Sequence, residues 1–114
     1  MPQELIKNPL FDKQGICYVE SILKVKIKIL AIGWNNISKI KHPELKNKIF
    51  ELIKALQNST QIWESKRDKQ VKLYYLKVKK KYLCAICKHY NKHGFLITAY
   101  YTYKIKGDKR IWPK

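Results

Sequence analysis

The stretch FLITAYYTY, residues 95–103, decides how this chain folds. Successive side chains of a β-strand point to opposite faces, so this stretch divides into two sets. The set expected to face a core consists of Phe95, Ile97, Ala99 and Tyr101. The opposite set consists of Leu96, Thr98, Tyr100 and Thr102. A row of hydroxyl groups on one strand face suits the binding of a phosphodiester.

Three short apolar runs precede this stretch and are also predicted to be strands. They lie at residues 61–64, 71–79 and 82–90, and the last strand is expected over 95–104. The connections at 79–81 and 91–94 are too short for helices and are typical of hairpin turns. The second half of the chain therefore predicts an antiparallel meander.

The first half of the chain predicts one main helix over about residues 43–57. Pro43 suits a first helical position. Apolar residues then follow helical spacing at Leu45, Ile49, Leu52, Ile53 and Leu56. Upstream, residues 24–29 alternate between lysine and apolar side chains, which indicates a strand with Val25, Ile27 and Ile29 inward.

Together these patterns predict an α+β fold. We expect an N-terminal helical part packed on a roughly four-stranded antiparallel sheet, with room for an extra N-terminal strand. The length of 114 residues suits one domain. Residues 1–15 are interpreted as a lead-in and residues 16–114 as that single domain.

The charge of the chain points to an anionic partner. The formal net charge is +17, and 15 of the 25 basic residues lie in residues 58–114 with only 3 of the 8 acidic ones. Nucleic acid is the commonest partner of so basic a protein, although an acidic protein would use the same field. A membrane surface is disfavoured because no basic amphipathic helix is visible.

The compartment predicted from the sequence is the cytoplasm. The amino terminus lacks the apolar stretch of a secretory signal, and no run reaches transmembrane length. The three cysteines form an odd number, which argues against a disulfide framework.

A metal site and a cofactor are not expected. Cys84, Cys87, His89 and His93 have zinc-like spacing, but on a strand Cys84 would face away from Cys87 and His89. The acidic residues are scattered, which disfavours a two-metal nuclease. His89 and His93 are interpreted as surface residues near a turn.

Two groups of polar residues are candidates for catalysis. His42 precedes Pro43, and a histidine at a helix amino terminus tends to stay neutral, as a general base must. A packing or capping histidine is the alternative. Lys66 and Arg67 could stabilise charge on a scissile phosphate, unless they form a simple solvated turn.

Aromatic and hydroxyl side chains are candidates for contact with nucleic acid. Tyr74 and Tyr75 would lie on opposite faces of one strand, so we expect one in the core and the other free to stack on an unpaired base. Thr98, Tyr100 and Thr102 would form the hydroxyl row, or else an ordinary wet strand face.

Several short motifs occur in a recognisable order. They are His42-Pro43-Glu44-Leu45, Ser65-Lys66-Arg67-Asp68, a Tyr-Tyr strand, Gly94 to Tyr100, and a closing Ile111-Trp112. Over roughly residues 34–112 the chain resembles small phage- and plasmid-associated members of the barnase–EndoU–colicin–RelE superfamily of RNases. The resemblance implies metal-independent RNA cleavage, as a cytoplasmic toxin that an acidic antitoxin protein neutralises.

The resemblance also implies site residues and a mechanism. By position, the resemblance implies a catalytic set of His42, Lys66 or Arg67, Thr98 and Tyr100. The residues expected to bind RNA are Tyr74, Tyr75, Thr102, Lys104 and Trp112. The RNA 2′-hydroxyl would attack its own phosphate and leave a cyclic phosphate. A basic RNA- or DNA-binding module without catalysis, and an interaction protein that docks an acidic partner, are the alternatives.

Overall fold

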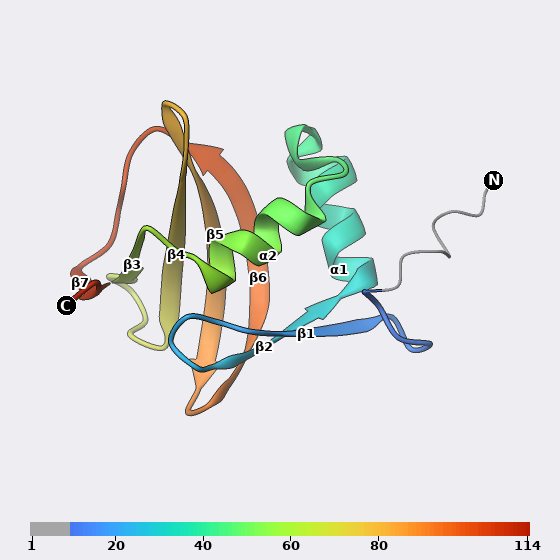
Figure 1. The fold of residues 1–114 in the computed structure, drawn as a ribbon, viewed down its shortest axis with the longest axis horizontal. Helices are drawn as coiled ribbons and strands as arrows, with labels where there is room; N and C mark the ends of the chain where they lie inside the picture. The colour runs from blue at the N-terminus through green and yellow to red at the C-terminus, as the bar shows by residue number, and fades with distance from the viewer. Residues whose placement is uncertain (1–9) are drawn as a thin grey trace.

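The computed structural model describes residues 10–114 and folds them around one mixed β-sheet (Figure 1). Within these residues the sheet has seven strands in the order β1-β2-β6-β5-β4-β3-β7. The strands are β1 (Ile16–Glu20), β2 (Lys26–Leu30), β3 (Gln61–Glu64), β4 (Val71–Val78), β5 (Lys81–Tyr90), β6 (His93–Thr102) and β7 (Lys109–Trp112). All neighbours pair antiparallel except β2 and β6, which are parallel.

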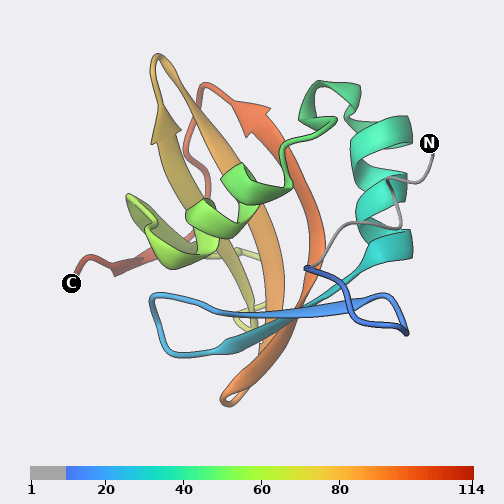
Figure 2. The same ribbon diagram turned by 45° about the vertical axis from the view of Figure 1, so that its right-hand side comes forward.

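The helical part is small and lies between β2 and β3. It consists of α1 (Ala31–Asn35), the π-helical η2 (Asn36–Lys41), the single 3-10 turn η3 (Pro43–Leu45) and α2 (Ile49–Gln57). Helix α2 lies across one face of the sheet, with the β1–β2 hairpin beside it (Figure 2). We call this side the helix face.

The predicted architecture of a helical part on a roughly four-stranded antiparallel sheet is wrong. The strands over β3, β4, β5 and β6 lie close to the predicted bounds, but β1, β2 and β7 join the same sheet. Ile27 and Ile29 of β2 are buried as expected, and Lys26, Ile27 and Lys28 pair in parallel with the start of β6. The fold is therefore mostly sheet. The first nine residues of the expected lead-in lie outside the described residues.

The predicted helix over 43–57 is also too long. It begins at Ile49, because Asn47 takes a left-handed conformation with φ 63° and Lys46 is extended. The residues before this break form only the turn η3. The apolar stripe is nevertheless used: Leu45, Ile49, Leu52 and Leu56 are all buried against the helix face.

A β-bulge in β6 changes which side chains face the core. Cys87 pairs with Leu96 and Ile86 with Thr98, which leaves Ile97 without a partner in the ladder. As a result Leu96 packs on the main core, whereas Phe95 and Ile97, predicted to be inward, are 38% and 42% exposed. The predicted alternation holds only from Thr98 onward.

Both hairpins of the meander use two-residue turns. Val78 pairs with Lys81 and Tyr90 with His93, and the first turn residues, Lys79 and Asn91, have φ 58°. The glycine predicted for the second turn lies in strand β6 instead. A Cβ on Gly94 would lie 2.5 Å from the carbonyl oxygen of Lys88 and 3.1 Å from Cδ1 of Ile27.

Replacing Gly94 with alanine is expected to lower the free energy of unfolding by about 1–3 kcal/mol, as overpacking does in other cores. The added methyl would press on β5 backbone at the site where β2 meets β6. Gly33→Ala is the matched control, because the nearest atom to its Cβ, in Leu30, is 3.9 Å away. Urea denaturation of both variants measures the difference, and equal stability would contradict the expected clash.

The opposite side of the sheet, which we call the back face, carries a second and smaller core. Its buried members are Leu73, Tyr75 and Cys84, and Tyr100 and Ile105 pack on them. Segment 103–108 links β6 to β7 at the far edge of the sheet (Figure 1). In residues 10–114, no helix combines the length and apolarity needed to cross a membrane.

Candidate functional site

An open pocket with a volume of ≈ 580 Å³ lies on the back face. It is bounded by the β3–β4 loop, by strands β4 and β6, and by the segment that leads to β7. The lining residues are Ser65, Lys66, Arg67, Leu73, Tyr100, Ile105, Lys106 and Gly107. Three of the five predicted catalytic residues, Lys66, Arg67 and Tyr100, thus meet at one pocket.

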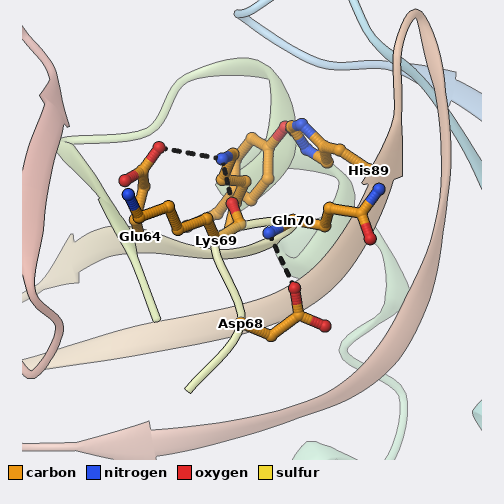
Figure 3. Close-up of polar contacts among 7 residues, drawn as sticks. Glu64, Asp68, Lys69, Gln70 and His89 are labelled. Atoms are coloured by element: carbon orange, nitrogen blue, oxygen red, sulfur yellow. Dashed lines mark hydrogen bonds and ion pairs between the residues drawn. The ribbon is translucent and has the colours of Figure 1, made fainter. Parts of the chain in front are cut away.

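Asp68 fixes the loop that carries the two cations. Its Oδ1 accepts a hydrogen bond from the backbone N–H of Gln70 at 2.9 Å (Figure 3), and its Oδ2 lies 3.2 Å from Nζ of Lys88 on β5. The Gln70 hydrogen bond and the Lys88 ammonium lower the pKa of Asp68 below its usual range. Asp68 therefore stays ionised and keeps the Lys66–Arg67 loop tied to the sheet.

The hydroxyl of Tyr75 holds the opposite wall of the pocket. It accepts a hydrogen bond from the backbone N–H of Lys106 at 2.9 Å and lies 3.2 Å from the Lys106 carbonyl oxygen. Gly107 adopts φ 135°, and a Cβ there would lie 2.7 Å from Cβ of Trp63. These contacts place the Lys106 backbone at the pocket.

The pocket contains an uncompensated positive charge. Lys66, Arg67 and Lys106 line it, and among residues 10–114 none of the three forms an ion pair with a carboxylate. Cations gathered without acidic partners favour an anionic ligand, and arginine can bind a phosphate through two parallel hydrogen bonds. The electrostatics of the pocket therefore suit a phosphate group.

His42 approaches the pocket through Tyr100. The centroids of the two rings are 5.8 Å apart, with the planes tilted by 46°. His42 is about one-third exposed, and its Nδ1 lies 3.7 Å from Oε2 of Glu44. Burial, and next the neighbouring Cys84, raise the pKa of Tyr100 to about 12, so its phenol remains a hydrogen-bond donor at neutral pH.

The expected reason for a neutral His42 is not found. The helix that was to follow it is a three-residue turn, so His42 does not lie at the amino terminus of a long helix dipole. Its side chain makes no capping hydrogen bond, and its backbone N–H donates to the carbonyl of Ile37. This backbone hydrogen bond ends η2 and fixes the position of the His42 backbone.

The predicted hydroxyl row is only partly available. Thr98 lies on the back face, one step along β6 from Tyr100, because it pairs with Ile86 as Tyr100 pairs with Cys84. Thr102 instead exchanges hydrogen bonds with the backbone of Lys104. Of the row, Tyr100 lines the pocket, and Thr98 lies two residues from it on the same face without lining the pocket.

Three residues predicted to bind RNA are parts of the cores. Tyr74 is fully buried on the helix face and Tyr75 is 1% exposed on the back face, so neither can stack on a base. The expectation that one of them is free is wrong, because segment 103–108 covers the second ring. Trp112 pairs with Ile62 and packs, half-buried, on the main core.

The structure contains a buried polar network that the sequence did not indicate. The hydroxyl of Tyr74 donates to Oγ of Ser21 at 3.0 Å and lies 2.8 Å from Nε2 of His89. His89 is 8% exposed, so its interpretation as a surface residue is wrong. Strand alternation from Cys87 does place His89 on the core side, which is the signal that could have found it.

Cys84 and Cys87 lie in different cores, on opposite faces of the sheet, as predicted. In the described part of the chain, no three histidine, cysteine or acidic side chains gather closely enough to bind a metal ion. Comparisons of the chain with protein-family models, curated proteins and solved structures gave no match.

Proposed function

We propose that this chain is a metal-independent endoribonuclease. The observation that carries the proposal is the meeting of Lys66, Arg67 and Tyr100 at one cationic pocket, with the His42 ring beside Tyr100. These residues come from three separate parts of the chain. The resemblance of the motifs around them to the barnase–EndoU–colicin–RelE superfamily supports the same function.

The reaction is attack of an RNA 2′-oxygen on the adjacent phosphorus. His42 takes the 2′-hydroxyl proton as the O2′–P bond forms, and the P–O5′ bond breaks. The leaving 5′-oxygen takes up a proton from solvent and becomes a hydroxyl group, and His42 returns its proton to solvent. The products are a 2′,3′-cyclic phosphate and a new 5′-hydroxyl end. No water, metal or cofactor is consumed in this step.

The other residues stabilise the phosphorane. Lys66 and Arg67 neutralise its developing charge, and the Tyr100 phenol donates a hydrogen bond to one of its oxygens. Thr98, one step along β6, orients the phosphate. The cations act where the charge grows, which is the most effective place for them.

The net charge of +17 supports an RNA substrate and an acidic inhibitor protein. A toxin of a toxin–antitoxin pair fits this charge, with the antitoxin bound over the cationic pocket. A basic nucleic-acid-binding module without catalysis would bind RNA equally well and would fail to cut it.

The proposal is tested with purified protein and a fluorescent RNA in EDTA. We expect cleavage that leaves a cyclic phosphate, and we expect no cleavage of the same oligonucleotide with a single 2′-deoxy sugar at the cut site. Mass spectrometry of the fragments identifies the ends. Efficient cutting of the deoxy substrate, or a requirement for added metal, would reject the mechanism.

A further inference from the structure

The back face extends beyond the pocket onto the β1–β2 hairpin. Tyr18 pairs with Lys28, Lys28 with Phe95, and Phe95 with Lys88, which places these four side chains in one row across four strands. The alternate residues of the hairpin, including Val19 and Ile27, are buried on the helix face. The row therefore lies on the same side of the sheet as the pocket.

Three aromatic rings are exposed in and beside this row. Tyr18 is 51% exposed, Tyr90 is 48% exposed and Phe95 is 38% exposed. The rings of Tyr90 and Phe95 are stacked, with centroids 6.0 Å apart and planes at 23°. Single exposed apolar side chains are ordinary, but grouped aromatic rings mark an interaction surface.

Lysines surround these rings. Nζ of Lys26 lies 4.7 Å from the centroid of the Tyr18 ring, and Nζ of Lys88 lies 5.9 Å from that of Tyr90. A cavity of ≈ 330 Å³ opens beside Tyr18, lined also by Glu20, Lys24 and Lys26. Asp68 pairs with Lys88, and the single charge of Glu20 lies beside two lysines, Lys24 and Lys26, so the surface remains cationic.

Flat exposed rings among lysines have the chemistry that recognises unpaired nucleotides. Bases stack on aromatic side chains while cations contact the phosphates, and every base offers a suitable face. A duplex keeps its bases stacked on one another and cannot use the rings in this way. We infer that Tyr18, Tyr90 and Phe95 form a stacking platform for single-stranded nucleic acid, separate from the cleavage pocket.

The platform and the pocket lie along one strand. Phe95 and Tyr100 are both in β6, with Thr98 between them on the same face. Because of the bulge at Ile97, their partners in β5, Lys88 and Cys84, are only four residues apart. At about 3.3 Å per strand residue the two are about 13 Å apart, a span within the reach of a short oligonucleotide. Delivery of RNA from the platform to the pocket rests on the proposed function. Binding of single-stranded nucleic acid to the platform does not.

The test is the affinity of a labelled 12-nucleotide RNA in which every sugar is 2′-O-methylated and so cannot be cut. Fluorescence anisotropy at constant salt is expected to show a dissociation constant about tenfold larger for Tyr90→Ala and for Phe95→Ala than for the wild type. Phe95→Leu, which keeps an apolar side chain but removes the flat ring, is expected to weaken binding similarly. DNA of the same sequence should show the same losses, and a duplex should show none.

Phe50→Ala is the matched control, because Phe50 is an equally apolar ring, 67% exposed, on helix α2. Its affinity should equal that of the wild type, and circular dichroism verifies the fold of each variant. Equal affinities of the Phe95, Tyr90 and wild-type proteins would overturn the platform, as would the absence of RNA binding. Failure of the ribonuclease proposal appears separately, as wild-type protein that binds but does not cut unmodified RNA.

Discussion

Replacing His42 with alanine is expected to slow RNA cleavage by a factor of about 10²–10⁴, the usual contribution of one positioned acid or base. The ring lies beside Tyr100, which lines the cationic pocket, and among residues 10–114 no histidine itself lines that pocket. The Cβ of alanine cannot accept the 2′-hydroxyl proton, whereas the pocket cations remain. Binding of an uncleavable RNA should therefore stay within about twofold of the wild type, and the loss should appear in kcat.

The matched control is His93→Ala, which removes an exposed imidazole at the β5–β6 turn. Its cleavage rate should be close to that of the wild type. Tyr100→Phe distinguishes the role of the Tyr100 hydroxyl from that of its ring, since it keeps the ring beside His42 but removes the hydrogen-bond donor. Full activity of the His42 variant would remove this histidine from the site, and full activity of both variants would place cleavage outside the proposed pocket.

The position of His42 could be anticipated only in part. The motif His42-Pro43-Glu44-Leu45 identified the residue, but the reason given for its protonation state depended on a long helix behind it. Because Asn47 takes a left-handed conformation, the helix cannot include the residues before it and begins only at Ile49. Asparagine adopts this conformation more readily than most residues, and a periodic apolar pattern does not reveal it. What brings His42 to the site is its packing against Tyr100.

The local strands were predictable because each depends on neighbours in sequence. Short apolar runs and the short hairpin connections between them placed β4, β5 and β6 close to their observed bounds. The parallel pairing of Lys26 and Lys28 with His93 and Phe95 joins residues far apart in the chain, and no local pattern encodes it. For that reason a mixed sheet of seven strands was mistaken for an antiparallel sheet of four.

The aromatic residues were assigned wrongly for a similar reason. Tyr74 and Tyr75 do lie on opposite faces, but segment 103–108 covers the second face and buries Tyr75 as well. The bulge at Ile97 then turns Phe95 outward. The exposed rings that gather near one another on the back face are Tyr18, Tyr90 and Phe95, and strict alternation did not indicate them.

Acid is expected to destabilise this protein between about pH 6.5 and pH 4 through His89. Burial, and next the charge of Lys72, lower the pKa of His89 from 6.5 to about 4. In this window the unfolded chain binds a proton that the folded chain refuses, so folding is favoured fully above pH 6.5 and progressively less below it. At 1.36 kcal/mol per pKa unit the loss approaches about 3 kcal/mol at pH 4.

The groups around the His89 imidazole explain why its pKa is lowered. Tyr74 remains protonated because burial raises its pKa, and its hydroxyl pairs with Nε2 of His89 and with Ser21. Lys72 is held by its ion pair with Glu64, at 3.1 Å. No carboxylate bonds to the ring among the described residues, so no negative charge there offsets an imidazolium.

Urea denaturation at several pH values between 4 and 7 measures this effect. His89→Gln keeps a polar side chain in the network but cannot titrate, so its unfolding free energy should vary much less across the window. His93→Gln, at an exposed position, should retain the slope of the wild type. The lowered pKa of Asp68 predicts a further loss of folding stability at still lower pH, where its carboxylate is protonated and its contacts with Gln70 and Lys88 weaken. A wild-type slope that survives in the His89 variant would assign the acid sensitivity to the carboxylates instead.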